Sequence, residues 1–229
     1  MKNFLKQYKH AWILVYMIVY FVWFFALEAA VTTNYTSMYC KIDDFFPFNE
    51  WFLIPYYLWF PFVAVTVAYF LFTSKTDYYK CCAFLFIGMT ICLLIYTIWP
   101  NGQDLRPDLS LLGRDNILIH IVSKLYATDT NTNVCPSIHV YNSIGIVIAI
   151  FHSEKLKKIH WLKYSSLILG VLICLSTVFL KQHSVIDGIC AIGLATVMYM
   201  IVYVPDYGKL YARYKMNRIS GNAKQNKLC

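Results

Sequence analysis

Charged residues are scarce in this chain. Only 14% of its 229 residues are Asp, Glu, Lys or Arg, whereas 59% are hydrophobic and 18% are aromatic. The mean hydropathy is +0.52. A soluble domain needs a more polar surface than this composition supplies, so the chain is predicted to be an integral membrane protein. The first apolar run also lacks a small-residue cleavage site, so no cleavable signal peptide is predicted.

Eight cysteines are present, but they do not indicate a disulfide scaffold. Five lie in or beside apolar runs, where cysteine behaves as a small hydrophobic residue; they are Cys81, Cys82, Cys92, Cys174 and Cys190. Cys40 and Cys135 fall in the two long loops, so one bridge between them is left open. Cys229 is the last residue and fits no prenylation motif.

Six apolar runs predict an all-α bundle of six transmembrane helices. They cover residues 11–27, 52–73, 81–99, 138–151, 162–180 and 185–204, and most approach the ~20 residues that span a bilayer. The fourth run is the shortest, and it spans only if its helix begins at Pro136 and continues past Phe151. Residues 1–219 are predicted to form this one domain, and residues 220–229 a disordered cytoplasmic tail.

The basic residues sort to one side of the predicted bundle. With six spans both termini share a side, and fifteen of the twenty lysines and arginines then fall on it. The positive-inside rule places that side, with the termini, in the cytoplasm. The net charge of +8 is therefore a topology signal and an attraction to anionic lipid, and no nucleic-acid partner is predicted. The short chain and compact loops favour a bacterial plasma membrane.

Two loops lie on the other side of the membrane. Residues 32–50 interleave aromatic and charged side chains, which predicts an aromatic belt or a lipid-entry segment at the interface. In the loop between residues 100 and 135, residues 116–126 predict an amphipathic helix that lies across the site as a partial lid. Five charged or titratable residues of this loop are predicted to be solvated: Asp108, Arg114, Asp115, His120 and Asp129.

A histidine and a carboxylate four residues apart, His183 and Asp187, lie where the last two apolar runs meet. On a helix such residues share a face, so Asp187 can hold one ring nitrogen of His183 and leave the other free. A carboxylate near the start of a transmembrane run is costly and usually functional. His139, which ends a Pro-Ser-Ile-His motif, and Arg106, which precedes a proline, fall on the same non-cytoplasmic side. Spans chosen on hydrophobicity alone thus collect these side chains at one membrane face.

The order Arg-Pro, Pro-Ser-x-His, and Ser followed by His-x-x-x-Asp resembles the phosphatidic acid phosphatase type 2 superfamily, which also includes membrane lipid phosphotransferases. The resemblance covers roughly residues 95 to 190. It implies that His183 attacks phosphorus to give a phosphohistidine, that Asp187 orients His183, and that His139 protonates the leaving group. It implies no metal ion and no other cofactor.

Two phosphate-binding cations of the family pattern are missing. Trp99 stands where the family usually has lysine, and Thr177 where it usually has arginine. Lys181 is the nearest substitute, Arg106 offers a bidentate fork for phosphoryl oxygens, and Ser137 lies at a predicted helix start whose N–H groups favour an anion. The departures look like the divergent branch that contains inositol phosphorylceramide and sphingomyelin synthases.

Several functions are consistent with this pattern. The preferred one is a membrane lipid phosphatase that hydrolyses a lipid phosphate or pyrophosphate at the outer face, and the second is a lipid phosphotransferase that uses the same histidines. A non-catalytic lipid-binding or transport protein is a third. A zinc site built from His120, His139, His183 and Asp187 is a further alternative, although no His-Glu-x-x-His or His-x-His run supports it. The lipid and the oligomeric state are left open.

Overall fold

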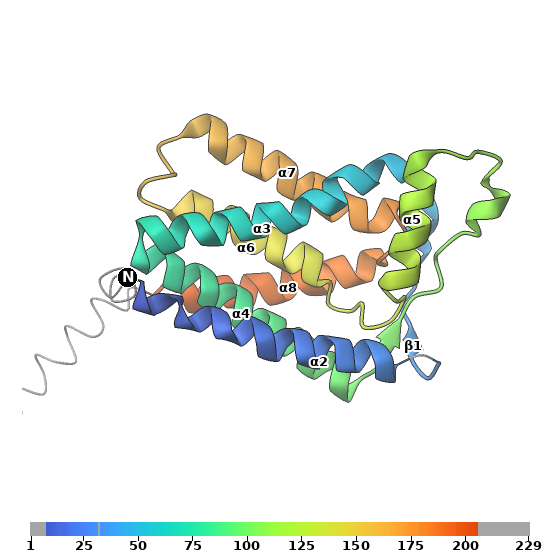
Figure 1. The fold of residues 1–229 in the computed structure, drawn as a ribbon, viewed down its shortest axis with the longest axis horizontal. Helices are drawn as coiled ribbons and strands as arrows, with labels where there is room; N and C mark the ends of the chain where they lie inside the picture. The colour runs from blue at the N-terminus through green and yellow to red at the C-terminus, as the bar shows by residue number, and fades with distance from the viewer. Residues whose placement is uncertain (1–7, 32, 206–229) are drawn as a thin grey trace, which may run out of the picture.

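The computed structural model describes residues 8–31 and 33–205, which form a bundle of apolar helices (Figure 1). Its long elements are η1 (Lys9–Val15) continued by α2 (Tyr16–Ala30), α3 (Leu53–Thr73), α4 (Lys75–Ile98), α6 (Ile138–His152), α7 (His160–Phe179) and α8 (Val185–Val202). A shorter helix, α5 (Ile117–Thr128), stands across one end of the bundle. The all-α architecture and the predicted loop helix are therefore confirmed. The predicted tail, residues 220–229, lies outside the described residues.

Within residues 8–31 and 33–205, five helical segments are long and apolar enough to cross a membrane. They are Lys9–Ala30, Glu50–Thr73, Lys75–Ile98, His160–Phe179 and Val185–Val202. The fourth predicted span, α6, has 15 residues, which is ~22 Å of helix against a hydrocarbon layer of ~30 Å. Only Ser74 separates α3 from α4. Lys75 and Lys80, which were counted among the basic residues on the side of the termini, therefore lie within the first turns of α4.

The helix α6 begins at Ile138 and ends at His152, so it starts two residues after Pro136 and continues one residue past Phe151. Ser137 is the N-cap, and its Oγ accepts a hydrogen bond from the Val140 N–H. A capping serine satisfies an N–H group that has no partner within the helix. Pro136 precedes this cap in a bend of the chain, and its carbonyl oxygen accepts a hydrogen bond from the Tyr96 hydroxyl of α4. The cap and this bond fix where the Pro-Ser-Ile-His motif enters the bundle.

The core is built around α6, which packs against α3, α4, α7 and α8. Close approach to α4 depends on small residues, because Gly88 lies against Tyr141 and Gly145 lies against Phe84. The rings of Phe84 and Tyr141 stack with centroids 5.0 Å apart, and the Tyr141 hydroxyl donates to the Phe84 carbonyl oxygen at 2.7 Å. Helices in lipid associate through such close packing and interhelical hydrogen bonds.

The first helix of the bundle, α2, packs chiefly against α4. Tyr16 and Trp23 of α2 form hydrogen bonds with Thr90 and Thr97 of α4, at 2.8 and 3.1 Å. By contrast, α3 packs on α4, α6 and α7. The two helices therefore share α4 as a neighbour and leave room between their facing sides.

The long loops before α3 and before α6 gather at the end of the bundle where α5 lies (Figure 1). Two short strands, β1 (Thr36–Ser37) and β2 (Asn101–Gly102), pair in parallel. Three short 3₁₀ segments complete this end: η2 (Lys41–Phe45), η3 (Glu50–Phe52) and η4 (Leu109–Leu112). In the segment predicted to be interfacial, Tyr39 and Phe45 are exposed as expected, but Asp43 is fully buried. Residues 33–50 therefore pack onto the bundle end as well as facing outward.

The glycine contact between α4 and α6 gives a test of the fold. In Gly88→Ala the new Cβ would lie 2.0 Å from Tyr141 Cζ, and the Tyr141 ring cannot move away without breaking its bond to Phe84. We expect a loss of ~1–3 kcal/mol in unfolding free energy, seen as a lower thermal unfolding midpoint in detergent. Gly193→Ala is the control, because a Cβ there meets no atom within 4 Å. Equal midpoints for the two variants would contradict this packing.

Candidate active site

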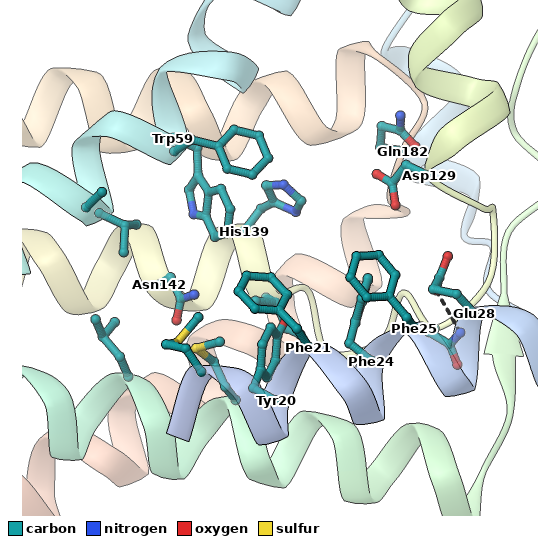
Figure 2. A pocket seen from close by; sticks show the side chains of 18 of the residues that line it. Tyr20, Phe21, Phe24, Phe25, Glu28, Trp59, Asp129, His139, Asn142 and Gln182 are labelled. Atoms are coloured by element: carbon teal, nitrogen blue, oxygen red, sulfur yellow. Dashed lines mark hydrogen bonds between the residues drawn. The ribbon is translucent and has the colours of Figure 1, made fainter. Parts of the chain in front are cut away.

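A cavity of 670 Å³ lies between the facing sides of α2 and α3. Figure 2 shows Tyr20, Phe21, Phe24 and Phe25 of α2 along one side and Trp59 of α3 on the other. Glu28, Asp129 and Gln182 lie together at one end of the view, whereas Asn142 lies toward the opposite end. Apolar walls with a few convergent polar groups are typical of a ligand site.

His183 and Asp187 meet at the N-terminus of α8. His183 Nδ1 lies 3.3 Å from Asp187 Oδ2, and the Ser184 N–H donates to the same oxygen at 2.9 Å. Asp187 is fully buried and His183 lines the cavity. A proton on Nδ1 would be held by Asp187, which leaves Nε2 as the free nitrogen of His183.

The predicted contact is present, but not through a shared helix face. His183 precedes the helix, Ser184 is its N-cap, and Asp187 occupies the third helical position. Asp187 therefore accepts from the N-cap backbone as part of a capping box. The carboxylate fixes the start of α8 and holds the histidine ring at the same time.

His139 lies in the first turn of α6 and also lines the cavity. Its ring stacks on Tyr56 at a centroid distance of 4.6 Å and lies 4.4 Å from the Trp59 ring. The His139 and His183 ring centroids are 5.9 Å apart. Among the described residues, His139 Nε2 has no hydrogen-bond partner. The two histidines are thus near enough to contact one phosphoryl group, and the aromatic rings fix the orientation of His139.

Arg106 joins the C-terminal end of α5 to the loop before α8. Its Nη1 donates to the Tyr126 carbonyl oxygen at 3.1 Å, and its Nη2 donates to the carbonyl oxygens of Asp129 and Thr130 and to Gln182 Oε1. Burial lowers the pKa of Arg106. The guanidinium does not line the cavity, so its predicted contact with phosphate stays a prediction.

The side chains of Lys181 and Ser137 also form hydrogen bonds with the protein's own backbone. Lys181 Nζ donates to the Asp43 carbonyl oxygen at 2.9 Å, and burial lowers its pKa although Asp43 and Asp44 act in the opposite direction. The fully buried Ser137 caps α6 with its Oγ, and its N–H donates to the Asp187 carbonyl oxygen at 3.2 Å. Neither residue lines the cavity, and their predicted binding of phosphate stays a prediction.

Two buried polar residues hold the chain segments that lead into α8 and α6, where the histidines lie. Sequence reasoning missed both residues. Asp43 accepts hydrogen bonds from Ser184 Oγ at 2.6 Å and from the Val185 N–H at 2.7 Å. Asn101 Oδ1 accepts from the backbone N–H groups of Val134 and Cys135 at 2.9 and 2.7 Å. These contacts join segments far apart in the chain. Neither the spacing of motif residues nor the periodicity of apolar residues in the sequence could therefore predict them. The polar loop residues position the two histidine-bearing helix starts.

Two carboxylates at the polar end of the cavity were missed as well. Asp129 was predicted to be a solvated loop residue, and this is wrong: it lines the cavity and accepts a hydrogen bond from the Tyr56 hydroxyl at 3.0 Å. Burial raises the pKa of Asp129, as does the nearby Glu28, while Tyr56, His183 and Arg106 act in the opposite direction. Glu28 is the charged residue of α2. A carboxylate in an apolar helix was the signal that could have found it.

The remaining predicted loop residues lie elsewhere. The side chains of His120 and Asp115 are largely exposed and pair with each other at 3.0 Å, so His120 does not join His139 and His183. Across residues 8–31 and 33–205, no three His, Cys, Asp or Glu side chains are grouped to hold a metal ion. Cys40 and Cys135 are both free thiols.

The Asp43 contacts give a test of how the site is positioned. Asp43→Ala removes the acceptor for Ser184 Oγ and the Val185 N–H, and each buried donor left without a partner costs ~1–3 kcal/mol. We expect a clearly lower thermal unfolding midpoint in detergent. Asp44→Ala is the matched control, because the neighbouring Asp44 is exposed and, within the described part of the chain, its side chain accepts only from the Tyr39 hydroxyl. A midpoint for Asp43→Ala as high as that of Asp44→Ala would show that Asp43 does not hold α8.

Comparison with known proteins found no matching family model, no similar curated protein and no similar solved structure.

Proposed function

We propose that the protein is an integral membrane enzyme that cleaves a lipid phosphate ester or pyrophosphate through His183, as the resemblance to the phosphatidic acid phosphatase type 2 superfamily implies. The observation that carries the proposal is the pairing of His183 with Asp187 beside His139, at the polar end of a largely apolar cavity. A lipid has the matching form, with a polar phosphate at one end and apolar chains at the other.

In the proposed reaction, the lone pair on His183 Nε2 attacks phosphorus and the bond from phosphorus to the lipid oxygen breaks. Asp187 accepts the Nδ1–H and so stabilises the positive charge that develops on the ring. His139 donates a proton to the departing oxygen, which leaves as an alcohol from a phosphate ester or as a lipid phosphate from a pyrophosphate. A water molecule then attacks the phosphohistidine, gives its proton to His139, and releases phosphate with regeneration of His183.

The proposed topology has six spans, with α6 as the sixth. Because α6 is short and packs against four helices of the bundle, its ends can lie below the membrane surface while protein covers them. The positive-inside rule then places the α5 end, with the site, outside the cytoplasm. A bacterial plasma membrane is the proposed location.

Transfer to a second lipid is the other candidate. His183 is only 7% exposed, and α5 stands across this end of the bundle (Figure 1). A site that excludes water favours attack on the phosphohistidine by a lipid hydroxyl over attack by water. Supplying ceramide or diacylglycerol together with a phospholipid donor separates the two reactions, since transfer yields a new lipid and no free phosphate.

His183→Ala is expected to abolish turnover. Purified protein in detergent is given phosphatidic acid, phosphatidylglycerol phosphate and an isoprenyl pyrophosphate with EDTA throughout, and both released phosphate and labelled protein are measured. The wild type should release phosphate and form an acid-labile phosphoryl-enzyme, and His183→Ala should do neither because it lacks the nucleophile. His120→Ala is the matched control, because that histidine is exposed and does not line the cavity.

Activity that persists in His183→Ala, or that EDTA removes, would overturn the mechanism. Complete lack of turnover or transfer by the wild type on this panel would favour a lipid-binding or transport protein.

His139→Ala is expected to act according to the leaving group. General acid catalysis typically contributes ~10²–10⁴-fold, so hydrolysis of an alkyl lipid phosphate should fall by that order. A substrate with a nitrophenolate leaving group needs no proton and should lose much less. The rates of both substrates are compared in wild type and variant at the same pH. An equal loss for the two substrates would exclude His139 as the acid.

A further inference from the structure

We propose that Asn142 and Trp59 form a second polar subsite, deeper in the apolar part of the cavity, that binds a hydroxyl or a secondary amide of the lipid close to its phosphate. The inference rests on the proposed function, since that function places the lipid phosphate beside His183 and His139. It adds a determinant of specificity to the same site. The part of the lipid that links the phosphate to the apolar chain would be recognised by hydrogen bonds.

Two unpaired polar atoms in this part of the cavity are the first observation. Asn142, which is 1% exposed, lines the cavity, and its Oδ1 has no hydrogen-bond partner among the described residues. Trp59 also lines the cavity, and its buried Nε1–H is likewise unpaired within residues 8–31 and 33–205. Most buried polar groups in proteins are paired, because an unpaired one is costly. An acceptor and a donor are therefore available to a ligand in one cavity.

The surroundings of Asn142 argue against a purely structural role. Asparagine in a membrane helix often forms a hydrogen bond to a neighbouring helix, but Asn142 Oδ1 accepts from no described residue although α6 packs against four helices. The next residue shows the contrast. Ser143 does not line the cavity, and its Oγ donates to the His139 carbonyl oxygen of the same helix at 2.7 Å. A polar residue at membrane depth is costly and usually functional.

The position of the subsite relative to the histidines is the second observation. His139 and Asn142 are three residues apart in α6, so they share a face of the helix and lie ~4.5 Å apart along its axis. The rings of Trp59 and His139 are 4.4 Å apart. Figure 2 shows Trp59 and Asn142 on the side of His139 that is away from Asp129 and Gln182. The subsite thus lies one helical turn from the proposed reaction centre, toward the apolar part of the cavity.

This separation fits a group close to the phosphate ester. Three or four single bonds of ~1.5 Å cover about one helical turn. If the phosphate lies beside His139, the group on the second carbon after the ester oxygen would reach Asn142 and Trp59. The subsite would therefore recognise the linking region of the lipid and leave the long chains to apolar contact.

The two protein atoms define the chemistry of the group. A hydroxyl or a secondary amide can accept from the Trp59 Nε1–H and donate to Asn142 Oδ1 at the same time. An ester can only accept, and a methylene group can do neither, so both would leave Asn142 Oδ1 unpaired. A site that hydrogen-bonds a substrate group discriminates against the analogue without it, because the buried atoms of the protein then lose their partners.

The test measures binding without turnover. Full-length His183→Ala in detergent is titrated with two pairs of lipid phosphates, and the members of each pair have identical chains. The first pair is an acyl glycerol phosphate with a free hydroxyl and its deoxy analogue, and the second is an amide-linked lipid phosphate and its ester-linked analogue. Dissociation constants are determined by native mass spectrometry. In at least one pair the hydroxyl or amide member should bind about tenfold more tightly, and the pair that shows this identifies the group.

Two further substitutions test the residues themselves. Asn142→Leu or Trp59→Phe, each added to His183→Ala, should reduce the preference to less than about threefold. Trp59→Phe keeps an aromatic ring next to His139 and removes the N–H. Thr66→Val is the matched control, because Thr66 is a buried residue of α3 that donates to the Phe62 carbonyl oxygen and does not line the cavity. The preference should persist in this control.

Each outcome decides the proposal. Equal affinities within both pairs would overturn it, and a water molecule that stays bound to Asn142 and Trp59 would give this result. An unchanged preference in folded Asn142→Leu and Trp59→Phe variants would also overturn it. If Asn142→Leu fails to fold, Trp59→Phe decides alone. A wild type that turns over no lipid, while His183→Ala shows the preference, would refute the proposed reaction but support the subsite. Turnover that requires His183, together with equal affinities, would do the reverse.

Discussion

The backbone N–H groups at the N-terminus of α8 need hydrogen-bond acceptors inside an apolar bundle, and this need constrains the whole candidate site. The first N–H groups of a helix have no partners within it, and leaving them unpaired away from water is costly. Asp187 and Asp43, both fully buried, accept from Ser184 and Val185 at this point. Negative charge is also favoured here by the helix dipole. Because Asp187 also holds His183, the group that starts the helix is the group that orients the ring.

A backbone contact extends this constraint to the second histidine. The Ser137 N–H donates to the Asp187 carbonyl oxygen at 3.2 Å, so α6 and α8 begin side by side. Asn101 fixes the chain that leads into α6 through the N–H groups of Val134 and Cys135. The positions of the two histidines therefore follow from the pairing of backbone groups at helix starts, which needs no ligand.

The sequence predicted the helices well because a long apolar run in a membrane must pair its backbone N–H and C=O groups within the chain, and a helix does so. It also predicted that His139, His183 and Asp187 would come together, since each lies next to an apolar run at the same end. It could not predict where Arg106 and Lys181 point. Both donate to main-chain oxygens of residues elsewhere in the chain, and residue type does not tell whether a cation binds the protein or a ligand. Asp43, Asn101 and Asp129 were missed for the same reason, because their partners lie far away in the chain.

The composition of the cavity bears on how a substrate would be held. Because no lysine or arginine is part of its described lining, attraction of phosphate to cations would contribute less to the proposed reaction than in a site lined by basic residues. Burial of acyl chains against the aromatic residues of α2 and α3 offers binding free energy of ~25 cal/mol for each Å² of apolar surface. Binding energy from the unreactive part of a substrate can position the reacting group. In the proposed reaction, the apolar cavity would thus take over the positioning that the missing cations would have supplied.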